Sequence, residues 1–125
     1  MKVFEIEIKS PKEVGREADA AAKAIKEGKY LEPTSKIVVS SLEILSKILT
    51  SERIRMLQVI RANNPSSIYG LAQLMGKDRR NVLRELRYLH GMHLVKVRKE
   101  AKSHSPRRNI VPYVDFSKIV VGIPI

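Results

Sequence analysis

Residues 66–91 read SSIYGLAQLMGKDRRNVLRELRYLHG, and they indicate more about the fold than any other part of the chain. The first part predicts a short helix that begins at the serine pair and stops at Gly76, because glycine readily takes the left-handed conformation that ends helices. The second part predicts a helix that begins at Asp78, a residue type that caps helix N-termini, and ends at Gly91. Two short helices joined by a turn are a helix-turn-helix.

The second predicted helix has an apolar face and a basic face. At 100° per residue, the apolar face gathers Val82, Leu83, Leu86, Leu89 and His90. The opposite face gathers Arg80, Asn81, Arg84, Arg87 and Tyr88. An α-helix fits the DNA major groove, where arginine pairs bidentately with guanine and asparagine with adenine. We therefore predict that this helix reads duplex DNA, with Arg80, Asn81 and Arg84 nearest the base edges and Arg87 and Tyr88 at phosphates. The plainer alternative is that these side chains only solvate an exposed face.

A basic hairpin follows this helix directly. Residues 94–99 (LVKVRK) predict a strand, residues 101–106 a polar loop, and residues 107–111 (RRNIV) an antiparallel return strand. A hairpin in this position is the wing of a winged helix. We expect the cations of this hairpin to contact the DNA backbone or the minor groove and to add affinity more than sequence preference. These cations are Lys96, Arg98, Lys102, Arg107 and Arg108. The alternative is that the hairpin is merely exposed to solvent.

Four further side chains near the two helix starts are candidates for DNA contact. Ser67 opens the first helix, where its hydroxyl either helps to hold a phosphate or simply caps the helix. Tyr69 extends from the same turn toward the DNA backbone, and Lys77 lies in the connecting turn. Arg79 either contacts a phosphate or packs along the neighbouring helix.

The net charge of +11 is unevenly distributed. Residues 1–50 contain nine Lys/Arg and eight Asp/Glu, a net of +1, and residues 51–125 contain fifteen and five, a net of +10. From residue 77 to residue 108, eleven basic residues face three acidic ones. A concentration of positive charge on the helix-turn-helix and hairpin indicates a polyanionic partner.

The rest of the chain predicts an α+β protein, a winged helix-turn-helix with an N-terminal strand-helix extension. Residues 4–9 alternate like a half-exposed strand, and residues 10–28 predict a helix with an alanine-rich face over residues 14–25. A strand is expected at 35–39, helices after the caps at 40–43 and at Thr50, and a final edge strand at 119–125. The predicted division is an arm, residues 1–34, and a DNA-binding domain, residues 35–125.

Several function classes receive no support. The chain contains no cysteine, no glycine-rich phosphate loop and no paired carboxylates in an apolar setting, so we expect neither an enzyme nor a cofactor. His90 and His93 are close in sequence, but Gly91 separates them and nothing completes a metal site, so no metal is expected. No signal-peptide core or membrane-length apolar run is present, which makes a cytoplasmic location the default.

The chain resembles winged-helix DNA-binding proteins of the MarR/ArsR type, and more narrowly a group of small prokaryotic regulators and antitoxin-like proteins. The resemblance lies in residues 49–53 (LTSER), 67–72 (SIYGLA), 76–82 (GKDRRNV) and 111–113 (VPY), and in Leu86, Leu89, Gly91, Leu94 and Val95. It implies a homodimer that binds duplex DNA and regulates transcription, most simply as a repressor. Glu85 departs from the older helix-turn-helix pattern, which prefers an apolar residue there, and Gly76-Lys77-Asp78 lengthens the turn.

Other classes of function remain open. In an antitoxin, residues 1–35 would hold a toxin while the winged helix binds DNA. A plasmid centromere-binding protein would bind arrays of repeated sites in place of one operator. RNA binding is a weaker alternative, because no strand carries the paired aromatic residues of an RNA-recognition platform.

Overall fold

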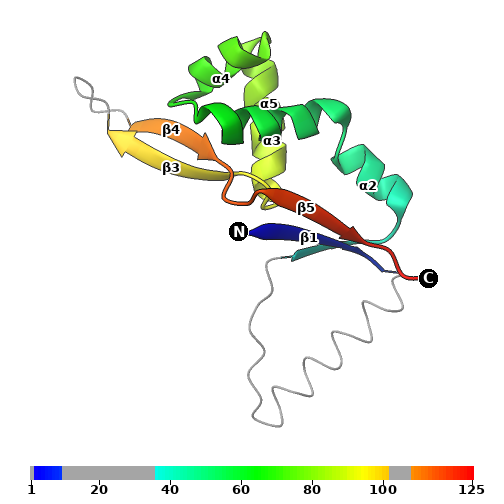
Figure 1. Cartoon of the computed structure of the whole chain (residues 1–125). Coiled ribbons are helices and arrows are strands. Elements are labelled where there is room, and N and C mark those ends of the chain that lie inside the picture. Colours follow the sequence, from blue (N-terminus) through cyan, green and yellow to red (C-terminus); the bar gives the residue numbers. More distant parts are fainter. Residues whose placement is uncertain (1, 10–35, 102–107) are drawn as a thin grey trace. The chain divides into compact units, whose positions relative to one another are not determined.

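A computed structural model describes residues 2–9, 36–101 and 108–125 (Figure 1). The chain divides into two compact units. One consists of residues 1–2 and 49–117, and the other of residues 3–48 and 118–125. We call them the winged-helix unit and the sheet unit. None of the helices in the described ranges is both long and apolar enough to cross a membrane.

The winged-helix unit contains three helices followed by a two-stranded hairpin (Figure 1). The helices are α3 (Ser51–Asn63), α4 (Ile68–Met75) and α5 (Arg79–Gly91). The hairpin pairs β3 (Lys96–Ala101) antiparallel with β4 (Arg108–Tyr113). This order of three helices and a hairpin confirms the predicted winged helix-turn-helix and the α+β fold class.

The core of this unit is formed where the three helices and the hairpin meet. Ile60 of α3, Leu71 of α4 and Val82 and Leu89 of α5 are fully buried. The chain beyond α5 adds Leu94, Val95, Val111, Pro112 and Phe116. The buried residues of α5 recur at three- and four-residue spacing, so the helix presents one stripe to the core and leaves the opposite side outward.

The helix ends follow the capping residues in the sequence. Thr50 accepts a hydrogen bond from the amide of Arg53, and Asp78 accepts one from the amide of Arg80. Asn64 and Gly76 end α3 and α4 in the left-handed conformation, with φ of 47° and 64°. The tight turn at Gly76 sets where α5 starts relative to α4 and therefore which face of α5 meets the core.

The connection from α5 to the hairpin differs from the prediction in two ways. β3 begins at Lys96, two residues later than expected, because the amides of Leu94 and Val95 donate to the carbonyl of Leu89 and close the helix end. His90, predicted to complete the packed face of α5, is exposed, and that prediction is wrong. The packed stripe of the last turn is occupied by Leu89, which is fully buried, and His90 lies about 100° further around the helix, outside that stripe.

The described residues of the sheet unit form a three-stranded parallel sheet and one short helix. Its strands are β1 (Val3–Ile8), β2 (Lys36–Val39) and β5 (Lys118–Gly122), in the order β2-β1-β5, and α2 (Leu42–Ile48) follows β2. Phe4, Ile6 and Val39 are buried on one face. The other face carries an ion-pair cluster in which Glu7 binds Lys36 at 3.1 Å. The predicted strands near residues 4–9, 35–39 and 119–125 are thus confirmed, with β5 at an edge.

The observed division of the chain differs from the predicted boundary near residue 34. Residues 36–48 and 118–125 group with β1, because β1 pairs with β2 on one side and with β5 on the other. In the sequence, residues 49–117 of the winged-helix unit therefore lie between β2 and β5 of the sheet unit. Parallel pairing of β1 with β2 requires a crossover connection between them. The helix predicted for residues 10–28 falls in that connection and lies outside the described residues.

Candidate nucleic-acid interface

The outward face of α5 carries the arginines that the sequence placed there. Arg80, Arg84 and Arg87 are exposed, and Arg79 at the helix start is exposed as well. Val82, Leu86 and Leu89 are buried on the opposite side. The helix is 13 residues long, which corresponds to about 20 Å. One side of α5 therefore presents a row of exposed arginines, and the buried residues on its other side hold the helix against the core.

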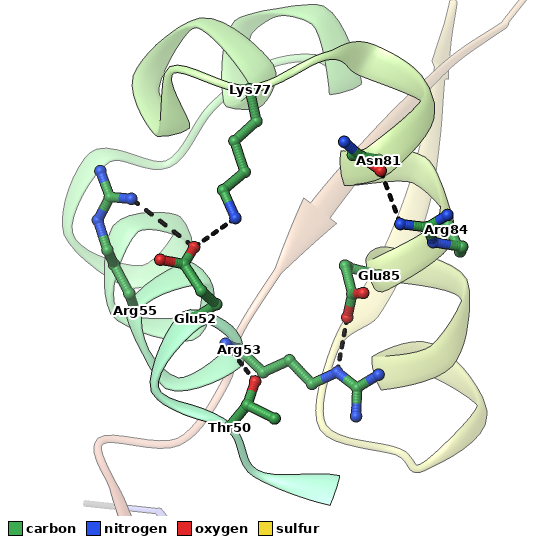
Figure 2. A network of polar contacts seen from close by, with 8 residues as sticks. All are labelled: Thr50, Glu52, Arg53, Arg55, Lys77, Asn81, Arg84 and Glu85. Carbon is green, nitrogen blue, oxygen red and sulfur yellow. Dashed lines mark hydrogen bonds and ion pairs between the residues drawn. The ribbon is translucent and has the colours of Figure 1, made fainter. Parts of the chain in front are cut away.

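Asn81 and Arg84 are bound to each other on this face. Nη2 of Arg84 donates a hydrogen bond of 2.6 Å to Oδ1 of Asn81, one turn earlier in the helix (Figure 2). Both side chains are exposed. The two residues predicted to read separate bases thus form one side-chain pair.

Arg53 of α3 connects α3 to α5. Its Nε donates to Oε2 of Glu85 at 2.6 Å, and its guanidinium carbon lies 3.9 Å from the centre of the Tyr88 ring. The side chains of Arg53 and Glu85 are 18% and 30% exposed, so this ion pair is partly shielded from water. Glu85 is therefore an anchor for α3, which explains why a carboxylate occupies a position that is usually apolar. Tyr88, predicted at a phosphate, has its ring engaged by Arg53.

Glu52 gathers two further cations at the start of α3. Lys77, from the turn before α5, lies 2.5 Å from Oε2 of Glu52, and Arg55 lies 4.0 Å from the same oxygen (Figure 2). The hydrogen bond from Lys77 is the main reason why the pKa of Glu52 is lowered. Lys77, a predicted DNA contact, is therefore partly neutralised within the protein.

A cavity of about 270 Å³ lies between the starts of α3 and α5. Met56, Met75 and Val82 form its apolar lining, and three polar pairs border it: Glu52 with Lys77, Arg53 with Glu85, and Asn81 with Arg84. Figure 2 shows these pairs together. Both carboxylates that line the cavity are engaged by cations other than Arg84.

The residues at the start of α4 have mixed roles. The hydroxyl of Ser67 accepts a 2.9 Å hydrogen bond from the amide of Gly70, so Ser67 is the helix cap that the alternative interpretation expected. The ring of Tyr69 is 61% exposed, and its hydroxyl accepts a hydrogen bond from Gln73 at 2.9 Å. Tyr69 thus projects from the surface, whereas Ser67 is held within the helix end.

The base of the hairpin is tied to the N-terminus by Asp115. This carboxylate binds Lys96 at 2.5 Å and Lys2 at 3.3 Å. The hydrogen bond from Lys96 is the largest cause that lowers the pKa of Asp115, and the same bond raises the pKa of Lys96. Lys96 therefore helps to fix the hairpin, and its charge is partly offset.

Further along the hairpin, the described cations of β3 are Arg98 and Lys99. Arg98 is exposed and lies 5.7 Å from the ring of Tyr113 on the paired strand. Lys99, which we did not single out from the sequence, is also exposed, and its place next to Arg98 in a cationic strand was the signal for it. Lys102 and Arg107 lie outside the described residues, and of Arg108 the structure describes the backbone in β4.

The structure therefore sorts the predicted DNA contacts into two sets. Exposed side chains on one surface of α5 form the first set: Arg79, Arg80, Asn81, Arg84 and Arg87, among which Asn81 and Arg84 contact each other. Side chains with other contacts inside the protein form the second: Ser67, Tyr69, Lys77, Tyr88, Lys96 and Arg98. Within the described ranges, no group of three His, Asp or Glu side chains is placed to hold a metal ion.

Comparison with known proteins places the chain in a family. No curated protein matches it. Among solved structures, one similar chain is described as a possible transcriptional regulator from Methanosarcina mazei Go1, with 13% sequence identity and a TM-score of 0.46. The match covers 58% of this chain and 62% of that one, so this chain spans less than two thirds of that protein. The sequence pattern of the HVO_A0114 family matches residues 48–121, which contain the described helices and hairpin of the winged-helix unit. The chain therefore belongs to the HVO_A0114 family.

Proposed function

We propose that this protein binds duplex DNA through α5 and the β3–β4 hairpin and thereby regulates transcription. The observation that carries the proposal is the exposed arginine stripe of α5, backed by a fully packed stripe on its other side. An α-helix with its side chains is about 10–12 Å across, which matches a major groove about 12 Å wide. A rigidly anchored helix with outward arginines has the shape and charge for that groove.

The contacts divide by chemistry. Arg80 and Arg84, in the first two turns of α5, are proposed to reach base edges, because the N-terminal part of a recognition helix enters the groove most deeply. Arg87, farther along, and Arg98 on the hairpin are proposed to contact phosphates. Phosphate contacts supply affinity for any sequence, whereas base contacts supply preference.

The proposal is tested by titrating labelled duplex DNA with the protein between about 50 and 200 mM salt. Because each neutralised phosphate contributes a slope of about −0.9 to log K against log salt, phosphate contacts from Arg87 and Arg98 predict a slope of about −2 or steeper. Single-stranded RNA of equal length serves as the comparison. A slope near zero, or tighter binding of RNA than of duplex DNA at equal salt, would refute the proposal.

Glu52 is expected to limit DNA affinity. Replacing it with glutamine removes the carboxylate that holds Lys77 and Arg55, which frees two cations at the start of α3 for phosphates. We expect Glu52→Gln to tighten duplex binding about threefold at low salt, to the same extent for every sequence, because phosphate contacts carry no sequence information. Glu5→Gln, which neutralises an exposed carboxylate of β1, is the matched control. Equal effects of the two substitutions would show that Glu52 has no such role.

We further propose that the protein acts as a homodimer, most simply as a repressor. The support is the set of exposed apolar side chains near the C-terminal end, where Val120, Val121 and Ile123 are 44%, 38% and 53% exposed. Burial of such side chains against a second copy is favourable. Light scattering at micromolar concentration is expected to give twice the mass of the chain, and a monomeric mass with and without DNA would contradict this. Toxin docking through residues 1–35 stays a prediction.

A further inference from the structure

The contact between Asn81 and Arg84 changes what each residue is able to recognise. Reading adenine requires asparagine to use both ends of its amide, with Oδ1 accepting from N6 and Nδ2 donating to N7. In this structure Oδ1 of Asn81 already accepts from Nη2 of Arg84 at 2.6 Å. One of the two lone pairs of the acceptor that adenine recognition needs is therefore engaged by the neighbouring arginine, which also fixes the direction of the amide.

Arg84 keeps the donors that guanine recognition needs. A guanidinium has five N–H donors, and four of them form two edges, one of Nε with Nη2 and the other of Nη1 with Nη2. Each edge uses a different hydrogen of Nη2. One bond from Nη2 to Asn81 therefore leaves one complete edge, which is sufficient for a bidentate contact with O6 and N7 of guanine.

The neutral partner also preserves the charge of Arg84. The two carboxylates that border the same cavity are bound elsewhere, Glu52 by Lys77 and Glu85 by Arg53. A carboxylate beside Arg84 would orient it but offset its charge, whereas the amide of Asn81 orients it and leaves the charge available for DNA. Holding the side chain in advance also reduces the rotamer entropy lost on binding.

We propose that Asn81 is a positioning residue that directs Arg84 to one guanine, and that Asn81 does not itself specify an adenine. This inference rests on the proposed function and assigns a base preference within it. It predicts that Asn81 and Arg84 control the same base pair of the recognised site, and that Arg80 controls a different one.

The experiment is selection of bound duplexes from a random-sequence library, sequenced for the full-length wild type and for Asn81→Ala, Arg84→Ala and Arg80→Ala. All three positions are exposed, and thermal unfolding of each variant checks that it is folded. We expect Asn81→Ala and Arg84→Ala each to reduce the preference for guanine at one shared position by at least about fivefold. The double variant Asn81→Ala/Arg84→Ala, selected in the same way, should lose no more guanine preference at that position than Arg84→Ala alone. Arg80→Ala should leave that position unchanged.

Asn81→Asp separates orientation from charge. It keeps an acceptor oxygen for Nη2 but adds a negative charge, so the guanine preference should persist while overall affinity and the salt slope fall. Loss of an adenine position on Asn81→Ala, or an unchanged site in that variant, would overturn the inference and leave the proposed function intact. A wild type that binds no duplex DNA would instead overturn the proposed function, and the base assignment with it.

Discussion

Simultaneous replacement of Arg80 and Arg84 by alanine is expected to weaken binding to the preferred duplex by at least about 30-fold. Each arginine that pairs with a base contributes about 1–3 kcal/mol, and every 1.4 kcal/mol corresponds to a tenfold change in affinity. Both side chains are exposed, so their removal leaves the packed stripe of α5 untouched. The measurement is a fluorescence-anisotropy titration with preferred and with random duplexes, in which preferred DNA should lose more affinity than random DNA.

A matched control removes the same charge from elsewhere. Arg61 lies in the last turn of α3. It is eight residues, or about 12 Å along the helix, from Arg53, which contacts α5. Lys118 is exposed in β5. The double variant Arg61→Ala/Lys118→Ala lowers the net charge by two, as the test variant does. Equal losses for the two double variants, on both kinds of DNA, would mean that net charge and not the surface of α5 governs binding.

Leu89→Ala is expected to destabilise the winged-helix unit by about 2–5 kcal/mol. Leu89 is fully buried on the packed stripe of α5, and truncating a buried leucine removes apolar contacts and leaves a cavity. Its carbonyl also receives the amides of Leu94 and Val95, so the residue lies where the helix, the turn and the hairpin meet. Urea denaturation followed by circular dichroism measures the loss in the free energy of unfolding.

The control for this effect is Leu74→Ala in α4. Leu74 is 45% exposed, so its removal from the surface costs little, and alanine is the better helix former. We expect a change within about 0.5 kcal/mol. A similar loss of stability in Leu89→Ala and Leu74→Ala would show that the packed stripe of α5 is not the anchor described here.

The helices of the winged-helix unit could be predicted from the sequence because the residues that cap and end them are close together in the chain. The caps at Thr50, Ser67 and Asp78 and the left-handed stop at Gly76 are confirmed where they were expected. Each involves residues within a few positions of one another, so the chemistry that specifies them is contained in a short segment. The exposed face of α5 follows from helical periodicity in the same way.

His90 shows where this local reasoning fails. Periodicity placed it on the apolar face, but His90 is exposed, whereas Leu89 beside it is fully buried. A helical pattern describes which residues share a face. It does not describe how much of that face the neighbouring elements cover.

Ion pairs and strand pairs between residues far apart in the chain could not be predicted from sequence patterns. Arg53 and Glu85 are 32 positions apart, so the role of Glu85 as an anchor emerged only once α3 lay beside α5. The pairing of β1 with β5 joins the two ends of the chain, and it is why residues 36–48 and 118–125 belong to the sheet unit. Periodicity and capping specify helices, strands and their faces, since these depend on neighbouring residues. Which strand pairs with which, and which cation meets which carboxylate, depends on packing of the whole chain.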